Sequence, residues 1–136
     1  MSSDLDFDGN PQPVVLLNSR ISNNRARAVS HSGTATVQGA GIINNSLLEL
    51  RHVAVTRNTG QIDAPAGSAQ GGGIWNGVLL SGPPVQLTLH DSTITDNALT
   101  ANPNLAVQGG GLYTTLPVTL DQSHIADNSP NDCSGC

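Results

Sequence analysis

Residues 70–74 read QGGGI, and close copies occur as QGAGI at 38–42 and QGGGL at 108–112. A second phrase, apolar-x-x-Asn, recurs four times and ends at Asn24, Asn58, Asn97 and Asn128. Successive copies of this second phrase lie 31 to 39 residues apart. Self-similarity at such a period is typical of proteins that stack copies of one structural unit. We therefore interpret the chain as a solenoid.

Alignment on the asparagine places apolar residues in fixed columns. The positions ten, eight and three residues before each Asn hold only Val, Leu or Ile, as with Leu87, Leu89 and Ile94 in the third repeat. One residue separates the first two of these columns, which is the period of a strand with one buried face. A further apolar residue follows each glycine triplet. We therefore expect three short strands per turn and an all-β, right-handed parallel β-helix of about three to four coils.

Other folds fit this pattern less well. A leucine-rich repeat has a period of about 20 to 29 residues and a leucine pattern of its own. Helical repeats need an uninterrupted period of about 3.6 residues, which the frequent Gly, Pro, Ser and Thr residues break. A β-sandwich would show hairpin turns about every 8 to 12 residues.

The recurring Asn and Gly residues have physical roles in a stacked coil. Neighbouring strands lie about 4.8 Å apart, so each of the four Asn amides can donate to one coil and accept from the other, which forms a ladder. The triplet glycines are expected at tight turns where a Cβ would clash. They are Gly39, Gly41, Gly71, Gly72, Gly73, Gly109, Gly110 and Gly111. The preceding Gln38, Gln70 and Gln108 suit either a second amide ladder or a surface position.

The segments between each ladder Asn and the next glycine triplet differ in length and sequence. We expect loops there that leave the stack and carry any binding function, because solenoids tolerate length variation in such excursions. The β-helix repeats are expected to span 14–128, after an acidic N-terminal leader at 1–13 and before a C-terminal tail at 129–136.

Composition argues against several classes of partner. Five arginines face ten acids, there is no lysine, and the formal charge is −5, so the basic footprint of a nucleic-acid-binding protein is missing. No apolar stretch is long enough to cross a membrane as a helix, and the chain starts without the pattern of a signal peptide. We expect neither nucleic-acid binding nor membrane insertion.

The paired phrases G-G-x-apolar and apolar-x-x-Asn resemble the bipartite repeat of the polymorphic outer-membrane proteins. The stretch LTLHDSTITDN (87–97) resembles secreted bacterial right-handed parallel β-helix proteins of pectate-lyase-like architecture. The resemblance covers about residues 14–128 and implies a secreted or cell-surface location in a bacterium. It implies no single activity, since that superfamily includes lyases, hydrolases, adhesins and surface stalks.

Four residues are the best catalytic candidates on the expected outer face. His52, His90, Asp91 and Asp121 stand six or seven residues before a ladder Asn, in columns that point outward on adjacent coils. A polysaccharide lyase or hydrolase would need clustered acids with basic partners on such a face. Solvated polar residues are also what any outer face carries, and four coils offer a short surface for a sugar groove. We expect no catalysis.

Three acids near the start match the first half of a calcium loop. Asp4, Asp6 and Asp8 alternate and are followed by Gly9, which places oxygen ligands and a turn residue as calcium requires. The twelfth position of such a loop is Val15, so the bidentate carboxylate is missing. A weak calcium site and a solvated acidic leader both remain open, and no other cofactor is expected.

Both cysteines lie in the last four residues, as CSGC. A zinc site needs a second pair of ligands and a redox motif needs a βαβ context, and neither is present. Cys133 and Cys136 are therefore expected to form a local disulfide or to remain two thiols, unless Cys133 pairs with a cysteine outside this chain.

The expected function is structural or adhesive: a non-catalytic β-helix segment of a secreted or cell-surface protein that displays loops, with a carbohydrate or a host surface as its ligand. The alternative is a fragment of a carbohydrate-active enzyme of the polysaccharide lyase or hydrolase type. Solenoid ends expose unpaired coil faces. We therefore expect further coils to cover these ends, from another copy in an end-to-end stalk or fibre or from a longer parent chain.

Overall fold

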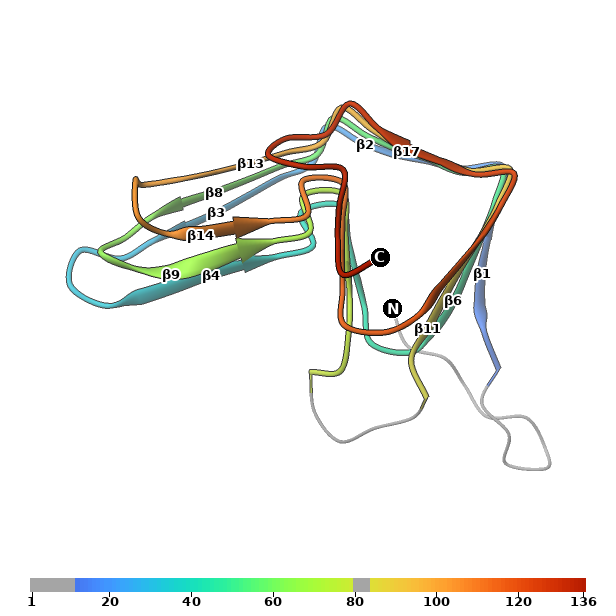
Figure 1. Ribbon diagram of the computed structural model, residues 1–136, viewed down its shortest axis with the longest axis horizontal. Coiled ribbons are helices and arrows are strands. Elements are labelled where there is room, and N and C mark those ends of the chain that lie inside the picture. The colour runs from blue at the N-terminus through green and yellow to red at the C-terminus, as the bar shows by residue number, and fades with distance from the viewer. Residues whose placement is uncertain (1–11, 80–83) are drawn as a thin grey trace.

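The computed structural model describes residues 12–79 and 84–136, whose regular secondary structure consists of β-strands alone. Every strand pairing among them is parallel, and the strands build five sheets to which each complete coil contributes one strand (Figure 1). The predicted fold class is therefore confirmed: the chain is a parallel β-solenoid of about three turns. The described residues contain no helix that could cross a membrane.

The first coil comprises β1 (Val14–Leu17), β2 (Arg20–Ser22), β3 (Arg25–Val29), β4 (Thr34–Gln38) and β5 (Ile42–Asn44). The second comprises β6 (Leu47–Arg51), β7 (Ala54–Thr56), β8 (Thr59–Asp63), β9 (Ala66–Gln70) and β10 (Ile74–Asn76). The third comprises β11 (Gln86–His90), β12 (Thr93–Thr95), β13 (Ala98–Ala101), β14 (Ala106–Gln108) and β15 (Leu112–Thr114). A shorter fourth coil comprises β16 (Val118–Asp121), β17 (His124–Ala126) and β18 (Cys133–Ser134).

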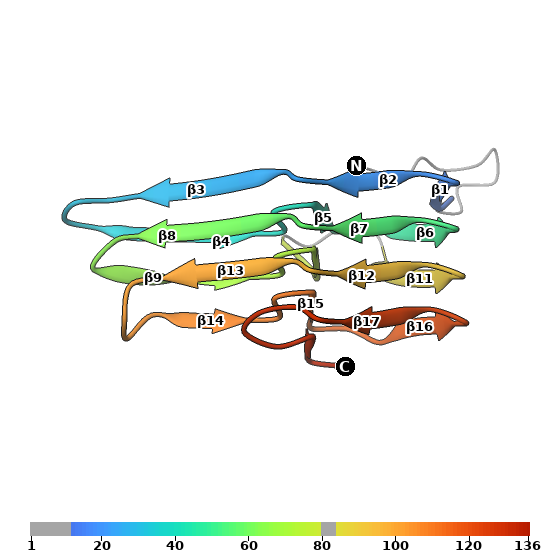
Figure 2. The same cartoon turned by 90° about the horizontal axis from the view of Figure 1, so that it is seen from above.

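We number the sheets in the order in which the first coil enters them. Sheet 1 is β1-β6-β11-β16, sheet 2 is β2-β7-β12-β17 and sheet 5 is β5-β10-β15-β18. Sheet 3 is β3-β8-β13 and sheet 4 is β4-β9-β14. Figure 2 shows the coils as parallel rows, one beneath the other.

Sheets 1, 2 and 5 enclose the main core, which is built from the aliphatic columns of the repeat. Leu48, Leu50 and Val55 of the second coil pair in register with Leu87, Leu89 and Ile94 of the third. All six side chains are buried. The equivalent side chains of the first and fourth coils lie at the ends of the stack, where they pack on this core and are partly buried, except Leu120, which is exposed.

The expectation of three strands per turn was wrong. The segments between each ladder Asn and the next glycine triplet are not irregular loops, since they form sheets 3 and 4, which extend as a flat lobe to one side of the main core (Figure 1). The two sheets of the lobe enclose a second core of Val37, Ile62, Ala64, Ala69 and Leu99. Length varies at the tips, 30–33, 64–65 and 102–105, and in the third coil, where β13 and β14 are shorter than their equivalents.

Small residues explain why these segments fold as strands. In β3 the sequence RARAV alternates exposed arginines with half-buried alanines, which is the period of a strand with one packed face. A Cβ on Gly60 would lie 2.5 Å from the side chain of Leu99 in the same sheet and 2.9 Å from that of Val37 in sheet 4, so the two sheets approach closely there. The thin second core therefore combines a few bulky side chains, Val37, Ile62 and Leu99, with alanine and glycine.

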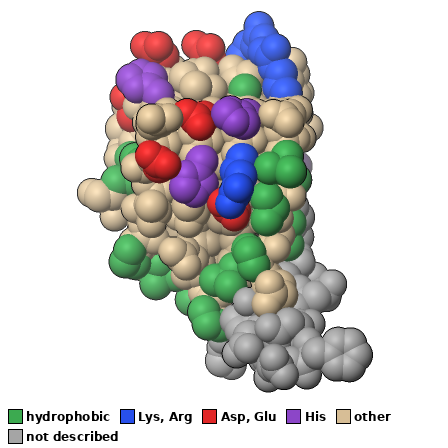
Figure 3. All heavy atoms as spheres, turned by 90° about the vertical axis from the view of Figure 1, so that its right-hand side faces the viewer, with side chains coloured by type: hydrophobic (Ala, Val, Ile, Leu, Met, Phe, Trp, Pro, Cys, Tyr) green, Lys and Arg blue, Asp and Glu red, His purple; other side chains and the backbone are tan. Residues whose placement is uncertain are grey.

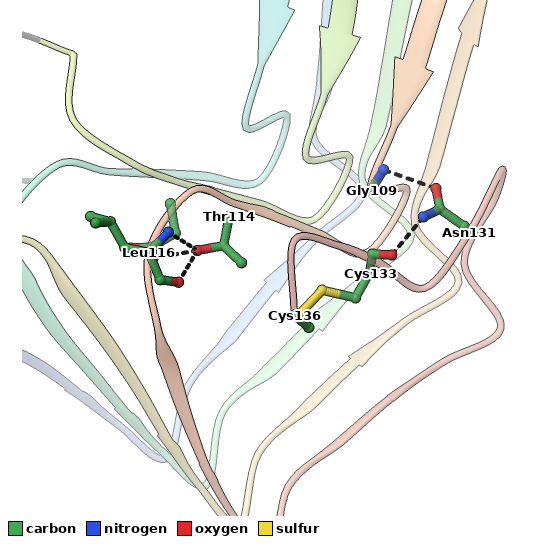
Figure 4. The surroundings of a disulfide bond; sticks show 7 residues. Gly109, Thr114, Leu116, Asn131, Cys133 and Cys136 are labelled. Carbon is green, nitrogen blue, oxygen red and sulfur yellow. Dashed lines mark hydrogen bonds between the residues drawn. A yellow bond between two sulfur atoms is a disulfide. The ribbon is translucent and has the colours of Figure 1, made fainter.

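The C-terminal residues were predicted to be a tail, but they complete the last coil. After Asn128 the chain bypasses the lobe, and β18 pairs with β15 so that Cys133 lies opposite Leu112 and packs on the main core. Asn131 accepts a hydrogen bond from the backbone N–H of Gly109 at 2.9 Å (Figure 4). Cys133 and Cys136 form a disulfide, which is one of the two local states expected from the sequence.

Candidate functional site

The outer face of sheet 1 holds the predicted catalytic candidates. Figure 3, which views the right-hand side of Figure 1, shows histidine and acidic side chains gathered on this face together with arginine. His90 stands at the end of β11 and Asp121 at the end of β16, and the two residues pair in register. His52 and Asp91 each follow directly after a strand of the same sheet, β6 and β11 respectively.

His90 lies between two carboxylates. Its Nδ1 is 2.9 Å from Oδ2 of Asp121, and its Nε2 is 3.3 Å from Oε1 of Glu49. Glu49 is the least exposed member, with 16 % of its side chain accessible, against 33 % for His90 and 61 % for Asp121. These three residues belong to β6, β11 and β16, so the group connects three successive coils. We call it the acid–histidine cluster.

Arg51 joins this cluster through Glu49. Its Nε donates a hydrogen bond to Oε1 of Glu49 at 2.6 Å. This hydrogen bond, together with the charge of the same carboxylate, raises the pKa of the Arg51 guanidinium above its ordinary value. The Glu49 carboxylate therefore already has an arginine and a histidine as partners.

The other two candidates form a looser pair. Nδ1 of His52 lies 4.0 Å from Oδ2 of Asp91, which is beyond hydrogen-bonding distance. The backbone N–H of His52 donates to the carbonyl of His90, and that of Asp91 donates to the carbonyl of Asp121, each at 3.0 Å. In the described parts of the chain, no side-chain hydrogen bond or ion pair joins this pair to the acid–histidine cluster. The four candidates thus occur as two pairs instead of one group, although a surface depression next to His52 and Asp91 also includes Asn18, Arg20 and Thr93.

Backbone conformation explains the residue types at His52 and Asp91. Both residues have positive φ, +53° and +45°, at the corner where sheet 1 turns into sheet 2, and Asn18 and Gln122 occupy the same corner in the other coils. Asn, Asp and His are the non-glycine residues that most often adopt this conformation. The column therefore has a structural reason to hold a histidine and an aspartate.

Ser92, which follows Asp91 at this corner, is engaged by the backbone. The hydroxyl of Ser92 is buried, donates to the backbone carbonyl of His90 at 2.7 Å and accepts from the N–H of Val53 at 3.0 Å. Because these bonds fix the turn between sheets 1 and 2, Ser92 serves the backbone. The arrangement can link coils and bind polar groups at the surface. Among the described residues, no hydroxyl group is hydrogen-bonded to the imidazole of His52 or His90.

The four ladder asparagines stack as predicted. In each step, the backbone N–H and the side-chain Nδ2 of one Asn both approach Oδ1 of the next, at 2.9 Å for Asn58 and Asn97. Asn58 and Asn97 are fully buried. At the end of the ladder, Oδ1 of Asp132 accepts both bonds from Asn128, at 2.9 and 3.1 Å. Asp132 thus takes the place of a fifth asparagine.

A second buried ladder was missed from the sequence. Asn44 donates to Oδ1 of Asn76 at 2.7 Å, and Asn76 donates to the hydroxyl of Thr114 at 2.9 Å. All three side chains are buried. The pattern was present, since an amide or hydroxyl residue stands two positions after the apolar residue that follows each glycine triplet.

The glutamines before the triplets do not form such a ladder. Gln38, Gln70 and Gln108 pair in register, yet no hydrogen bond joins their side chains within the described ranges. Oε1 of Gln70 instead accepts from the indole N–H of Trp75 at 3.4 Å.

The glycine triplets form the turn from the lobe back to sheet 5. The first glycine of each triplet has positive φ, as in Gly71 at +67°. A Cβ on Gly73 would lie 2.6 Å from the carbonyl oxygen of Gly111 and 2.9 Å from Nδ2 of Asn97. The third glycine is therefore required because the coil packs directly against its neighbour and against the Asn ladder.

The predicted calcium ligands, Asp4, Asp6 and Asp8, lie outside the described residues. Within 12–79 and 84–136, no group of three His, Cys, Asp or Glu side chains is arranged to hold a metal ion. The acid–histidine cluster fits this finding, because the two nitrogens of His90 face different carboxylates.

Sequence reasoning did not single out Glu49, which belongs to the acid–histidine cluster, or its partner Arg51 together with His90. Glu49 stands nine residues before its ladder Asn, and Arg51 stands seven before it. Both positions point outward on a strand of period two.

A comparison of the chain with protein families, with curated proteins and with solved structures found no match.

Proposed function

We propose that this chain is a non-catalytic structural or adhesive β-solenoid segment of a secreted or cell-surface protein. The observation that carries the proposal is the use of polar side chains. The acid–histidine cluster, whose residue types are those most often used in catalysis, connects β6, β11 and β16. The asparagines form ladders within the stack. In each case the polar group links one coil to the next.

The C-terminal disulfide supports an extracellular location. Disulfides persist in oxidising compartments and are rare in the reducing cytosol. The bond between Cys133 and Cys136 joins the ends of the turn that completes the fourth coil. A secreted or surface-displayed scaffold is consistent with such a bond.

A turnover assay separates this proposal from the enzyme alternative. The wild-type chain, His90→Gln and Asp91→Asn would be incubated with neutral and acidic polysaccharides, and reducing ends and unsaturated products would be measured. We expect wild type to match a protein-free control. Product formation that His90→Gln abolishes, while the variant keeps the wild-type circular dichroism spectrum, would contradict the proposal.

The adhesive part of the proposal is tested by binding. Wild type would be applied to immobilised polysaccharides and extracellular-matrix proteins, beside a variant in which 102–105 is replaced by residues 63–67 of the second coil. That segment joins Ile62 and Ser68, which pair in register with Ala101 and Ala106. If the tips of the lobe carry binding, the replacement weakens it and leaves the fold intact. Equal binding by both proteins would remove this tip from the contact surface.

A further inference from the structure

Charged side chains are distributed unequally along the solenoid axis. Residues 12–46 carry Arg20, Arg25 and Arg27 and no acid. The second coil, 47–79, carries two arginines and two acids, which balance. The described residues from 84 onward carry five aspartates and no arginine: Asp91, Asp96, Asp121, Asp127 and Asp132. One end of the described stack is therefore basic and the other acidic.

The two ends also expose strand edges that match. Among the described strands, β1 and β2 pair only with β6 and β7, and β16 and β17 pair only with β11 and β12. Each of these four strands keeps one row of backbone N–H and C=O groups without a strand partner there. Such edges are templates for pairing with another chain.

The same apolar columns reach both edges. Leu120 in β16 is 47 % exposed, whereas its equivalents Leu50 and Leu89 inside the stack are fully buried. At the opposite end, Leu16 and Ile21 are only partly buried. A fourth coil placed on a first coil in the register used within the chain would therefore continue the columns and cover this apolar surface.

The C-terminal turn restricts where such a contact can form. Asp132 already ends the Asn ladder at the acidic end, and β18, which pairs only with β15 among the described strands, has only two residues. A carboxylate offers acceptors only, so the ladder cannot continue past Asp132. The outer edges of β16 and β17 are therefore the longer unpaired strand edges at this end of the stack.

We propose that β1 and β2 of one copy dock on β16 and β17 of a second copy, head to tail, with the basic end of one facing the acidic end of the other. The inference rests on the proposed structural function and names its partner as the chain itself. The register Arg25↔Thr59↔Ala98↔Ser129 would place Arg25 over Ser129, which lies between Asp127 and Asp132 in the sequence. In this contact the Asn24 side chain turns away from the ladder position, which Asp132 fills, and Arg25 exchanges its hydrogen bond to Gln61 for the aspartates. A head-to-tail contact of this kind can repeat along a fibre.

Sedimentation velocity of the full chain over a range of protein concentrations tests the proposal. We expect association that grows with concentration and weakens as salt is raised, because exposed charges are screened over about 8 Å at physiological ionic strength. Arg25→Glu and Asp127→Arg should each raise the dissociation constant by about five- to tenfold at low salt. An equimolar mixture of these two variants should recover association, since each then meets an opposite charge.

Two controls change the same charge in the middle of the stack. Arg57→Glu matches the first variant, and Asp96→Arg matches the second, because Arg57, Asp96 and Asp127 occupy one column with positive φ. Both controls should associate as wild type does. A wild-type chain that stays monomeric at every concentration would overturn the proposal. So would a chain that associates only after residues 1–11 are removed, because its own acidic leader would then be the occupant of the basic end.

The polysaccharide assay on the same samples distinguishes a failure of the docking proposal from a failure of the proposed structural function. A monomer without turnover leaves the structural function standing and removes head-to-tail docking. Turnover by the wild-type chain removes the structural function whatever its state of association.

Discussion

Removal of the Asn58 side chain should strongly destabilise the stack. Its Oδ1 accepts from the N–H and the Nδ2 of Asn24 at 3.1 and 2.8 Å, and its Nδ2 approaches Oδ1 of Asn97 at 2.9 Å and the carbonyl of Ile21 at 3.0 Å. Asn58→Ala removes these contacts at a fully buried site. At about 1 kcal/mol net for each hydrogen bond, the expected loss is about 3 to 5 kcal/mol. That is a large share of the roughly 5–15 kcal/mol that stabilises a typical domain.

Urea denaturation followed by circular dichroism measures this loss, with Asn24→Ala as the matched control. Asn24 occupies the same column at the end of the ladder, is exposed, and donates through its side chain to Asn58 alone. We expect the control to lose about 1 kcal/mol. Equal losses for the two variants, or a loss below 1 kcal/mol for Asn58→Ala, would refute the role assigned to the ladder.

Three further predictions concern the turns, the C-terminal end and the acid–histidine cluster. Gly73→Ala should lower the urea midpoint strongly, because the added Cβ would lie 2.6 Å from a backbone carbonyl, whereas Gly33→Ala, whose Cβ would lie 3.1 Å from a flexible serine hydroxyl, should lower it little. Asp132→Ala should increase hydrogen exchange at the N–H of Asn128 and destabilise by about 1 to 3 kcal/mol, and Asp132→Asn should recover most of this, since it keeps the acceptor; equal effects of the two would contradict the capping role. His90→Gln should change the free energy of unfolding by less than about 1 kcal/mol, because His90 lies at the surface and its partner Asp121 is 61 % exposed, and a larger loss in urea denaturation would show that the link between coils is strong.

The main core could be predicted from the sequence because each coil repeats its aliphatic columns without interruption. Leu50, Val55 and their equivalents recur at fixed distances from the ladder Asn, so one alignment gave both the strands and their register. The Asn ladder followed from the same alignment, since an amide can both donate and accept along a stack.

The lobe could not be predicted because its sequence pattern is weak. Its strands alternate polar residues with alanine and glycine, as in RARAV and AGSAQ, and such small side chains give little periodic contrast in hydrophobicity. The different lengths of the tips hid the repeat further. Strand pairing there depends on stacking against the coils above and below, which no single segment encodes.

The candidate cluster was predicted in part. The outward columns identified His90 and Asp121, which do pair. Glu49 lies on the same face, two residues before the column that holds them, and was not considered. His52 and Asp91 were chosen for their chemistry, whereas the structure gives them a corner with positive φ that favours those residue types. Residue type alone could not separate these two reasons.

The central claim is that buried amide ladders hold successive coils in register, and NMR of the asparagine side-chain amides tests it most directly. Nδ2 of Asn58 and Nδ2 of Asn97 are buried and hydrogen-bonded to the neighbouring coils. We predict that their protons exchange slowly with solvent and show nuclear Overhauser contacts that connect Asn24, Asn58, Asn97 and Asn128 in order. Rapid exchange of these protons, or contacts that break this order, would contradict the account.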